Sequence, residues 1–273
     1  MDLNAPLQSA AGTDFNVDCA LTYQVSGTCD FLFQVHALNG RDQSVLSESL
    51  TVTPNVPVHV YADPTEHHRF VRLQMQAGAF ELRYQATVRR TIEPVDRFAA
   101  EVPIAQLPDH VLHHLMPTRY CESDLLSHAA QKQFAGLPPG YARVAGICDW
   151  IHTNIDYQVG SSNATTTSRD VFTQRAGVCR DFAHLGVTFC RALNIPARLV
   201  VGYANFADPP PDFHAVFEAY LGGRWVLFDA TRMSPLDELI RIASGRDAKD
   251  VAFAMIYGPA VMTGMSPLVS RFR

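Results

Sequence analysis

The sequence predicts the α+β fold class: a β-rich domain, expected to be a β-sandwich, and then a domain in which helices precede an antiparallel sheet. Short segments of alternating apolar and polar residues, separated by turn residues, fill positions 15 to about 92. Farther along, apolar residues first recur at helical spacing and alternate again only from Ala197 onward. Because 47% of the 273 residues are hydrophobic and 18% are charged, the chain can bury a sizeable core.

The N-terminal region carries strand patterns but no pattern that indicates chemistry. Its clearest strand patterns are Phe31–Leu38, Val58–Tyr61, Phe70–Met75 and Phe80–Val88. Prolines then punctuate a stretch that we interpret as a linker: Pro94, Pro103, Pro108 and Pro117. We therefore expect a β-rich domain over residues 1–100 and a second domain over residues 101–273.

Composition and charge exclude several functions. The net charge is −5 and the basic residues are scattered, so we expect no nucleic-acid partner. The first residues, Met1 to Asn4, have neither a basic region nor an apolar run, which argues against a signal peptide. Six cysteines are too few for a disulfide-built fold, so we expect a reduced, cytoplasmic protein. The uncharged stretch from Val251 to Ser270 is broken by proline and glycine and predicts buried strands, not a membrane helix.

Three histidines have a spacing that could hold a metal ion. His110, His113 and His114 would share one helix face. No carboxylate or thiolate pattern completes such a site, so we expect solvated histidines and no metal or other cofactor.

The chemistry centres on a helix that begins at Cys179. Apolar residues recur there at helical spacing: Phe182, Leu185, Gly186, Phe189, Cys190 and Leu193. The opposite stripe is polar: Arg180, Asp181, His184, Thr188 and Arg191. Asn194 suits the C-terminal end of the helix, and Pro196 prevents its continuation. Cys179 therefore lies in the first turn, where free N–H groups and the helix dipole favour a thiolate.

Other elements of this region prepare that helix. A helix is expected between Tyr141 and Ile155, followed by a polar loop from Gly160 to Thr167. Thr167 and Asp170 have capping-box spacing, which predicts a further short helix. Tyr120 and Cys121 would either line a cleft or pack a loop.

A hairpin supplies the partners of the cysteine. Two strand patterns, Asp212–Tyr220 and Trp225–Ala230, flank a turn centred on Gly222-Gly223. In that register His214 and Asp229 lie diagonally on one face of the sheet, within reach of each other. We therefore interpret Cys179 as a nucleophile, His214 as its base and Asp229 as the group that orients the histidine.

These residues resemble the transglutaminase-like superfamily. The resemblance rests on the run Gly177–Ala183 around Cys179, followed by His214 and Asp229, and on the preceding segment Trp150–Tyr157. It implies a papain-like α+β catalytic domain with a Cys-His-Asp triad. The segments Pro117–Asp124 and Gly245–Asp250 resemble bacterial transglutaminase-like proteins that carry a β-rich N-terminal domain. The superfamily includes peptidases and inactive members.

The function expected from this site is thiol-dependent acyl transfer on an amide of a peptide or protein substrate. We favour hydrolysis, by a cysteine peptidase or amidase. The loops Gly160–Thr167 and Ala207–Asp212, which should flank the site, are polar or rich in proline and offer no aromatic wall to exclude water. A transglutaminase, with an amine as acceptor, and a non-catalytic peptide-binding module are the alternatives. No membrane partner is expected, and the oligomeric state is open.

Overall fold

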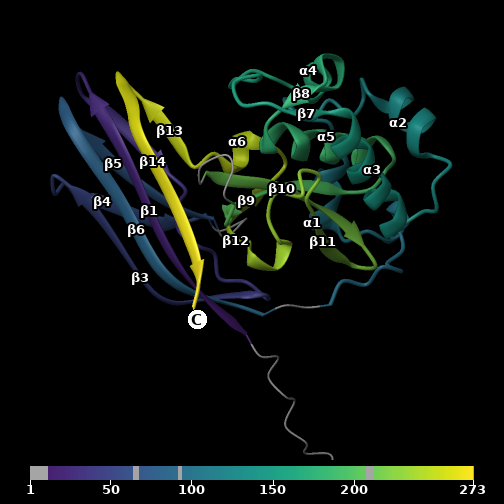
Figure 1. Cartoon of the computed structure of the whole chain (residues 1–273), viewed down its shortest axis with the longest axis horizontal. Coiled ribbons are helices and arrows are strands. Elements are labelled where there is room, and N and C mark those ends of the chain that lie inside the picture. The colour runs from purple at the N-terminus through teal and green to yellow at the C-terminus, as the bar shows by residue number, and fades with distance from the viewer. Residues whose placement is uncertain (1–11, 64–67, 92–93, 207–211, 273) are drawn as a thin grey trace, which may run out of the picture.

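A β-sandwich and a mixed helix–sheet part lie side by side in the computed structural model, which describes residues 12–63, 68–91, 94–206 and 212–272 (Figure 1). The sandwich has two four-stranded antiparallel sheets, in the orders β14-β1-β6-β3 and β13-β2-β5-β4. Its strands are β1 (Thr13–Val25), β2 (Cys29–Phe33), β3 (Gln43–Thr53), β4 (Val58–Ala62), β5 (Arg69–Met75), β6 (Gly78–Arg90), β13 (Ala254–Tyr257) and β14 (Ala260–Arg271).

Alternation along the strands explains why the two sheets pack face to face. Every second residue of β1 is buried: Phe15, Val17, Cys19, Leu21, Tyr23 and Val25. The Tyr23 ring meets the rings of Phe31 and Phe80 at centroid distances of 5.3 and 5.2 Å. These contacts place an aromatic layer between the sheets.

The last two strands correct the expected division of the chain. We expected residues 101–273 to form one domain, but β14 pairs with β1 and β13 pairs with β2. The helix–sheet part is therefore inserted between β6 and β13 of the sandwich. We also expected buried strands after Val251. The strands are present, but they are not fully buried, since Tyr257 and Val261 are 62% and 67% exposed. The boundary near residue 100 stays a prediction.

The inserted part consists of helices and a further four-stranded antiparallel sheet, in the order β11-β10-β9-β12. Its helices are α1 (Asp109–Leu112), α2 (Ser127–Phe134), α3 (Tyr141–Asn154), α4 (Ser168–Gln174), α5 (Cys179–Ala192) and α6 (Ala248–Val251). Its strands are β7 (Asp156–Tyr157), β8 (Ala176–Gly177), β9 (Ala197–Tyr203), β10 (Phe213–Leu221), β11 (Arg224–Phe228) and β12 (Ile240–Gly245). Short 3₁₀ helices cover Ile104–Gln106, His113–Leu115 and Leu236–Glu238.

Helix α5 is central to this part and begins at Cys179, as the sequence predicts. Asn194 follows its last turn with a φ of 63°, and the next residue, Ile195, donates its backbone N–H to the Cys190 carbonyl. The predicted polar stripe is not solvated, however. Asp181, His184, Thr188 and Arg191 are all at most 3% exposed. The chain on either side of α5 in sequence folds over this stripe, which an amphipathic pattern alone cannot reveal.

Ion pairs and a continuous core join the two parts. Glu218 on β10 is 1% exposed and pairs with Arg198 on β9 and Arg241 on β12 at 2.7 and 2.5 Å. Arg241 also lies 3.7 Å from Asp42 of the sandwich. The Tyr203 hydroxyl donates to the Val35 carbonyl at 2.5 Å. One buried apolar cluster runs through both parts.

His114 corrects the expectation of solvated histidines. Its side chain is 3% exposed and packs against the Trp225 ring at a centroid distance of 5.0 Å. Burial and the neighbouring His113 lower the pKa of His114 to about 2, so the imidazole is neutral. Within the described residues, no helix has the length and apolar character needed to cross a membrane.

Candidate active site

Cys179 stands at the N-terminus of α5, against the start of β10. The preceding residue, Val178, is extended, and its N–H donates to the Asp181 carboxylate at 2.9 Å, which closes the start of the helix. The Cys179 side chain is half-buried, unlike the other five cysteines, which are buried. Its Sγ lies 3.9 Å from the carbonyl oxygen of Phe213, next to His214. The helix terminus therefore delivers an accessible thiol to the start of β10.

His214 and Asp229 meet as the hairpin register requires. Phe217 pairs with Phe228 and Leu221 with Arg224, which is the register centred on Gly222-Gly223. His214 Nε2 lies 2.9 Å from Asp229 Oδ2, and the two side chains are 1% and 4% exposed. The other carboxylate oxygen, Oδ1, accepts hydrogen bonds from the N–H and the hydroxyl of Thr231 at 2.8 and 2.7 Å. Asp229 is therefore held from both sides.

The electrostatics favour an imidazolium at His214. Burial opposes the charge, but the hydrogen bond to Asp229 and the neighbouring Cys179 thiol outweigh it and raise the pKa of His214 to about 9. Burial likewise raises the pKa of Asp229, and the hydrogen bonds to His214 and Thr231 overcome it, so the net shift is downward. Nδ1 of His214 makes no well-formed hydrogen bond with a described residue, which leaves it open to the thiol or to a substrate atom.

Tyr157 on β7 belongs to the site, although no sequence argument singled it out. Its strand pairs in parallel with β8, Tyr157 opposite Gly177, just ahead of Cys179. Burial and the Cys179 thiol raise the pKa of Tyr157, while the main chain of Cys179 lowers it. The phenol therefore keeps its proton at neutral pH and lies against both the thiol and the backbone of Cys179. The sequence signal that could have identified Tyr157 is the strand β7, but a strand of two residues is too short to predict.

A cleft of about 420 Å³ opens beside Cys179. The lining residues include Ser162, Asn163, Ala164, Val178, Cys179, Arg180, Leu199, Val201, Asp212, Phe213, Ala215, Ala248, Val251, Ala252, Phe253 and Ala254. One wall is polar and comes from the predicted loop after Gly160. The other wall is apolar and comes from β9, β10 and the segment from α6 to β13. The sequence pattern did not place this last segment near the site.

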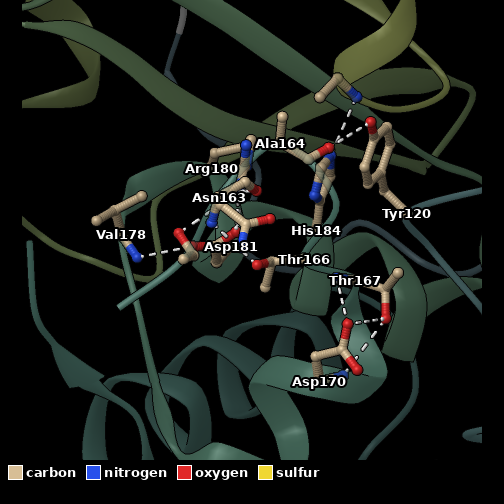
Figure 2. Close-up of polar contacts among 12 residues, drawn as sticks. Tyr120, Asn163, Ala164, Thr166, Thr167, Asp170, Val178, Arg180, Asp181 and His184 are labelled. Carbon is tan, nitrogen blue, oxygen red and sulfur yellow. Dashed lines mark hydrogen bonds and ion pairs between the residues drawn. The ribbon is translucent and has the colours of Figure 1, made fainter. Parts of the chain in front are cut away.

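Hydrogen bonds hold the polar wall in place (Figure 2). Arg180 pairs with Asp181 at 2.9 Å and donates to the Asn163 carbonyl at 2.9 Å. The Tyr120 hydroxyl donates to the Ala164 carbonyl at 2.8 Å, and the Tyr120 ring stacks on His184 at 5.4 Å. Below the loop, Thr167 and Asp170 form the predicted capping box of α4.

We expected Tyr120 and Cys121 either to line a cleft or to pack a loop. Tyr120 packs against the loop that lines the cleft, and Cys121 is fully buried. The proline-rich loop lies outside the described residues between 207 and 211. Within the described residues, no three histidine, cysteine or acidic side chains gather closely enough to hold a metal ion.

Two family models match most of the chain between them. Residues 13–110 match the bacterial transglutaminase N-terminal domain, and residues 127–230 match the transglutaminase-like superfamily. A solved structure from Cytophaga hutchinsonii, described as a candidate cysteine protease, is 43% identical in sequence. It matches with a TM-score of 0.93 over 96% of this chain and 92% of that one. The chain belongs to the transglutaminase-like superfamily.

The curated relatives of this superfamily member are similar over a shorter stretch. An uncharacterized protein of Mycobacterium leprae is 30% identical over 148 residues, which are 50% of this chain and 52% of that protein. One of Mycobacterium tuberculosis is 29% identical over 144 residues, 47% and 46% of the two chains. The chain thus spans about half the length of these relatives. The predicted superfamily and the predicted α+β class with a β-rich N-terminal region are confirmed.

Proposed function

We propose that this protein is a thiol-dependent enzyme that cleaves an amide bond of a peptide or protein substrate. The observation that carries the proposal is the buried His214, whose ring lies between the Asp229 carboxylate and the thiol at the start of α5. A histidine with a purely structural role would not need an accessible thiol beside it. Cys179 is the one cysteine that is only half-buried, which favours a catalytic role for the pair. The cytoplasmic location expected from the sequence stays a prediction.

The chemistry follows from the charge on His214. An imidazolium beside Cys179 stabilises the thiolate, which attacks the carbonyl carbon of the substrate amide. The proton on Nδ1 then passes to the departing amine, and the acyl group remains on sulfur as a thioester. Asp229 holds the ring in orientation through Nε2 and stabilises its charge.

Two donors stabilise the oxyanion of this step. The first is the backbone N–H of Cys179, which points out of the helix N-terminus. The second is the Tyr157 hydroxyl, which lies against the same backbone and keeps its proton. Water completes the reaction by attacking the thioester, with neutral His214 now acting as the base.

An amine acceptor is the second candidate, and one observation favours it. The flanking loops offer no aromatic wall, but other segments supply part of one. The rings of Phe213 and Phe253 stack at a centroid distance of 4.5 Å, and both residues line the cleft. Such a surface lowers the local concentration of water, which would favour an amine. The polar wall of Ser162, Asn163 and Arg180 keeps the other side of the cleft hydrated, so hydrolysis remains the first candidate.

The test offers the purified protein a glutamine- and leucine-containing peptide library together with a millimolar primary amine. Mass spectrometry then reads new peptide termini and new amine adducts. We expect new termini that disappear in Cys179→Ala. Adducts in place of termini, also lost in that variant, would make the enzyme a transglutaminase.

A non-catalytic binding module would give neither product. It would also leave Cys179 no more reactive than a free thiol. Iodoacetamide labelling of the six cysteines, read by peptide mapping, separates this alternative from the enzyme.

A further inference from the structure

We infer that the apolar half of the cleft is a specificity pocket for a bulky apolar side chain on the acyl part of the substrate. The inference rests on the proposed function and names the substrate class of that same site. Leu199, Val201, Phe213, Ala215 and Val251 line the pocket and are each at most 8% exposed.

The pocket has both the volume and the chemistry for such a side chain. The whole cleft has a volume of about 420 Å³, at the lower end of the range for small-molecule sites, and its apolar half alone has room for a leucine or phenylalanine side chain. Alanines at 215, 248, 252 and 254 keep the walls short, so the space is not filled by the protein itself. No charged side chain comes from the α6–β13 wall, since its lining residues are Ala248, Val251, Ala252, Phe253 and Ala254.

The position of the pocket assigns it to the acyl side of the scissile bond. Cys179 lines the pocket, whereas His214 does not. Phe213 and Ala215 alternate with His214 along β10, so their side chains point to the opposite face of the strand. The leaving amine must lie near His214 to take its proton, and the acyl group stays on sulfur. The acyl chain therefore extends away from His214, into the pocket.

The sandwich fixes the far wall. Gln34 follows β2 and is 1% exposed; its N–H donates to the Phe253 carbonyl at 2.9 Å, and its side-chain amide donates to the Asp250 carbonyl at 3.1 Å. The segment that carries Ala252 and Phe253 is thus tied to the sandwich at both ends of the turn between α6 and β13. This gives the sandwich a role in substrate selection, because it determines how far the wall stands from Cys179.

The experiment uses dipeptidyl chloromethyl ketones on the full chain. The thiolate displaces chloride and a carbon–sulfur bond forms, so the reagent stays on Cys179 as an acyl group would. The reagents carry glycine at both positions, or leucine or phenylalanine at one of them. Their rates of labelling Cys179 are divided by their rates with glutathione. We expect at least one apolar reagent to label Cys179 ten-fold or more faster than the glycine reagent.

Two variants test the pocket itself. Ala252→Phe places a ring in the pocket and should remove the apolar preference while iodoacetamide, a small reagent, still labels Cys179 at the wild-type rate. The matched control, Ser266→Phe, adds the same bulk at an exposed site on β14 and should keep the preference. Equal corrected rates for all reagents, with Cys179 still the fastest cysteine, would overturn the pocket and leave the proposed function intact. A preference that survives Ala252→Phe would also overturn it. No selective labelling of Cys179 by any reagent would remove the proposed function, and the pocket with it.

Discussion

His214 Nε2 lies 2.9 Å from Asp229 Oδ2 across a hairpin whose turn is made by two glycines. Gly222 and Gly223 have φ values of 56° and 81°, the left-handed backbone of a tight two-residue turn. A shift of one residue would turn Asp229 to the other face of the sheet. The local turn chemistry therefore sets the distance between the two side chains of the candidate site.

The first prediction concerns the charge that Asp229 stabilises. The pKa of His214 is raised above its ordinary value of 6.5 to about 9, so the imidazolium is fully present below pH 6.5 and is lost as pH rises through about 9. Asp229→Asn removes the anion and should move this loss to lower pH. We expect kcat at pH 8 to fall roughly 10⁴-fold, as for a triad that loses its orienting carboxylate.

The measurement is the pH profile of Cys179 alkylation and of amide cleavage. Asp237→Asn, an exposed acid in the last 3₁₀ helix, is the control and should leave both profiles in place. An unchanged alkaline limb in Asp229→Asn would mean that Asp229 does not tune His214.

The second prediction concerns the buried ion pairs of Glu218, which join β10 to β9 and β12. Burial raises the pKa of Glu218, but Arg241 and Arg198 outweigh it, so its net shift is downward from 4.5. The ionised pairs therefore stabilise the fold above pH 4.5 and lose this contribution as pH falls through the lower folded value. Glu218→Gln leaves two arginines underpaired and should cost about 3–5 kcal/mol of unfolding free energy.

Urea denaturation of Glu218→Gln at pH 7 measures this cost. Because the pairs join strands of the inserted sheet and reach the sandwich through Asp42, we expect both parts to unfold in one transition. A loss below about 1 kcal/mol, typical of an exposed pair, would contradict the prediction.

The third prediction concerns the contact between α5 and β10. A Cβ added at Gly186 would lie 2.5 Å from Cε1 of the Phe217 ring. Alanine gains about 1 kcal/mol in a helix, but overpacking costs about 1–3 kcal/mol, so we expect Gly186→Ala to be less stable by about 1 kcal/mol. Adding Phe217→Leu should restore part of the loss. Greater stability of the single variant in thermal unfolding would show that the ring moves aside freely.

The sequence predicts the site well where local rules determine the geometry. The start of α5 at Cys179, its termination just before Asn194 and the hairpin register all follow from residues close to one another in the chain. The polar stripe of α5 is different, because His184 is buried by contacts with Tyr120 and the backbone N–H of Ala248, which are distant in sequence.

The same limit explains the cleft. Its apolar wall comes from residues 248–254, whose position depends on Gln34 of the sandwich and on the return of β13 and β14 to the N-terminal sheets. Nothing in the alternation of β14 reveals that its partner is β1. The expectation of a site without an aromatic wall was based on adjacent loops, and the structure places Phe253 there from elsewhere.

The last prediction concerns Tyr157 as an oxyanion donor. Tyr157→Phe keeps the ring, which packs on Phe182 at a centroid distance of 5.8 Å, and removes only the hydroxyl. Loss of one such donor costs about 10²–10³-fold in kcat, because the interaction forms only as charge develops on the carbonyl oxygen. The KM should change little, and iodoacetamide labelling of Cys179 should stay within about two-fold, since alkylation forms no oxyanion. Tyr61→Phe removes a hydroxyl from β4, outside the residues of the site, and should leave kcat unchanged. If Tyr157→Phe lowers alkylation and kcat equally, the hydroxyl acts on the thiolate and not on the oxyanion.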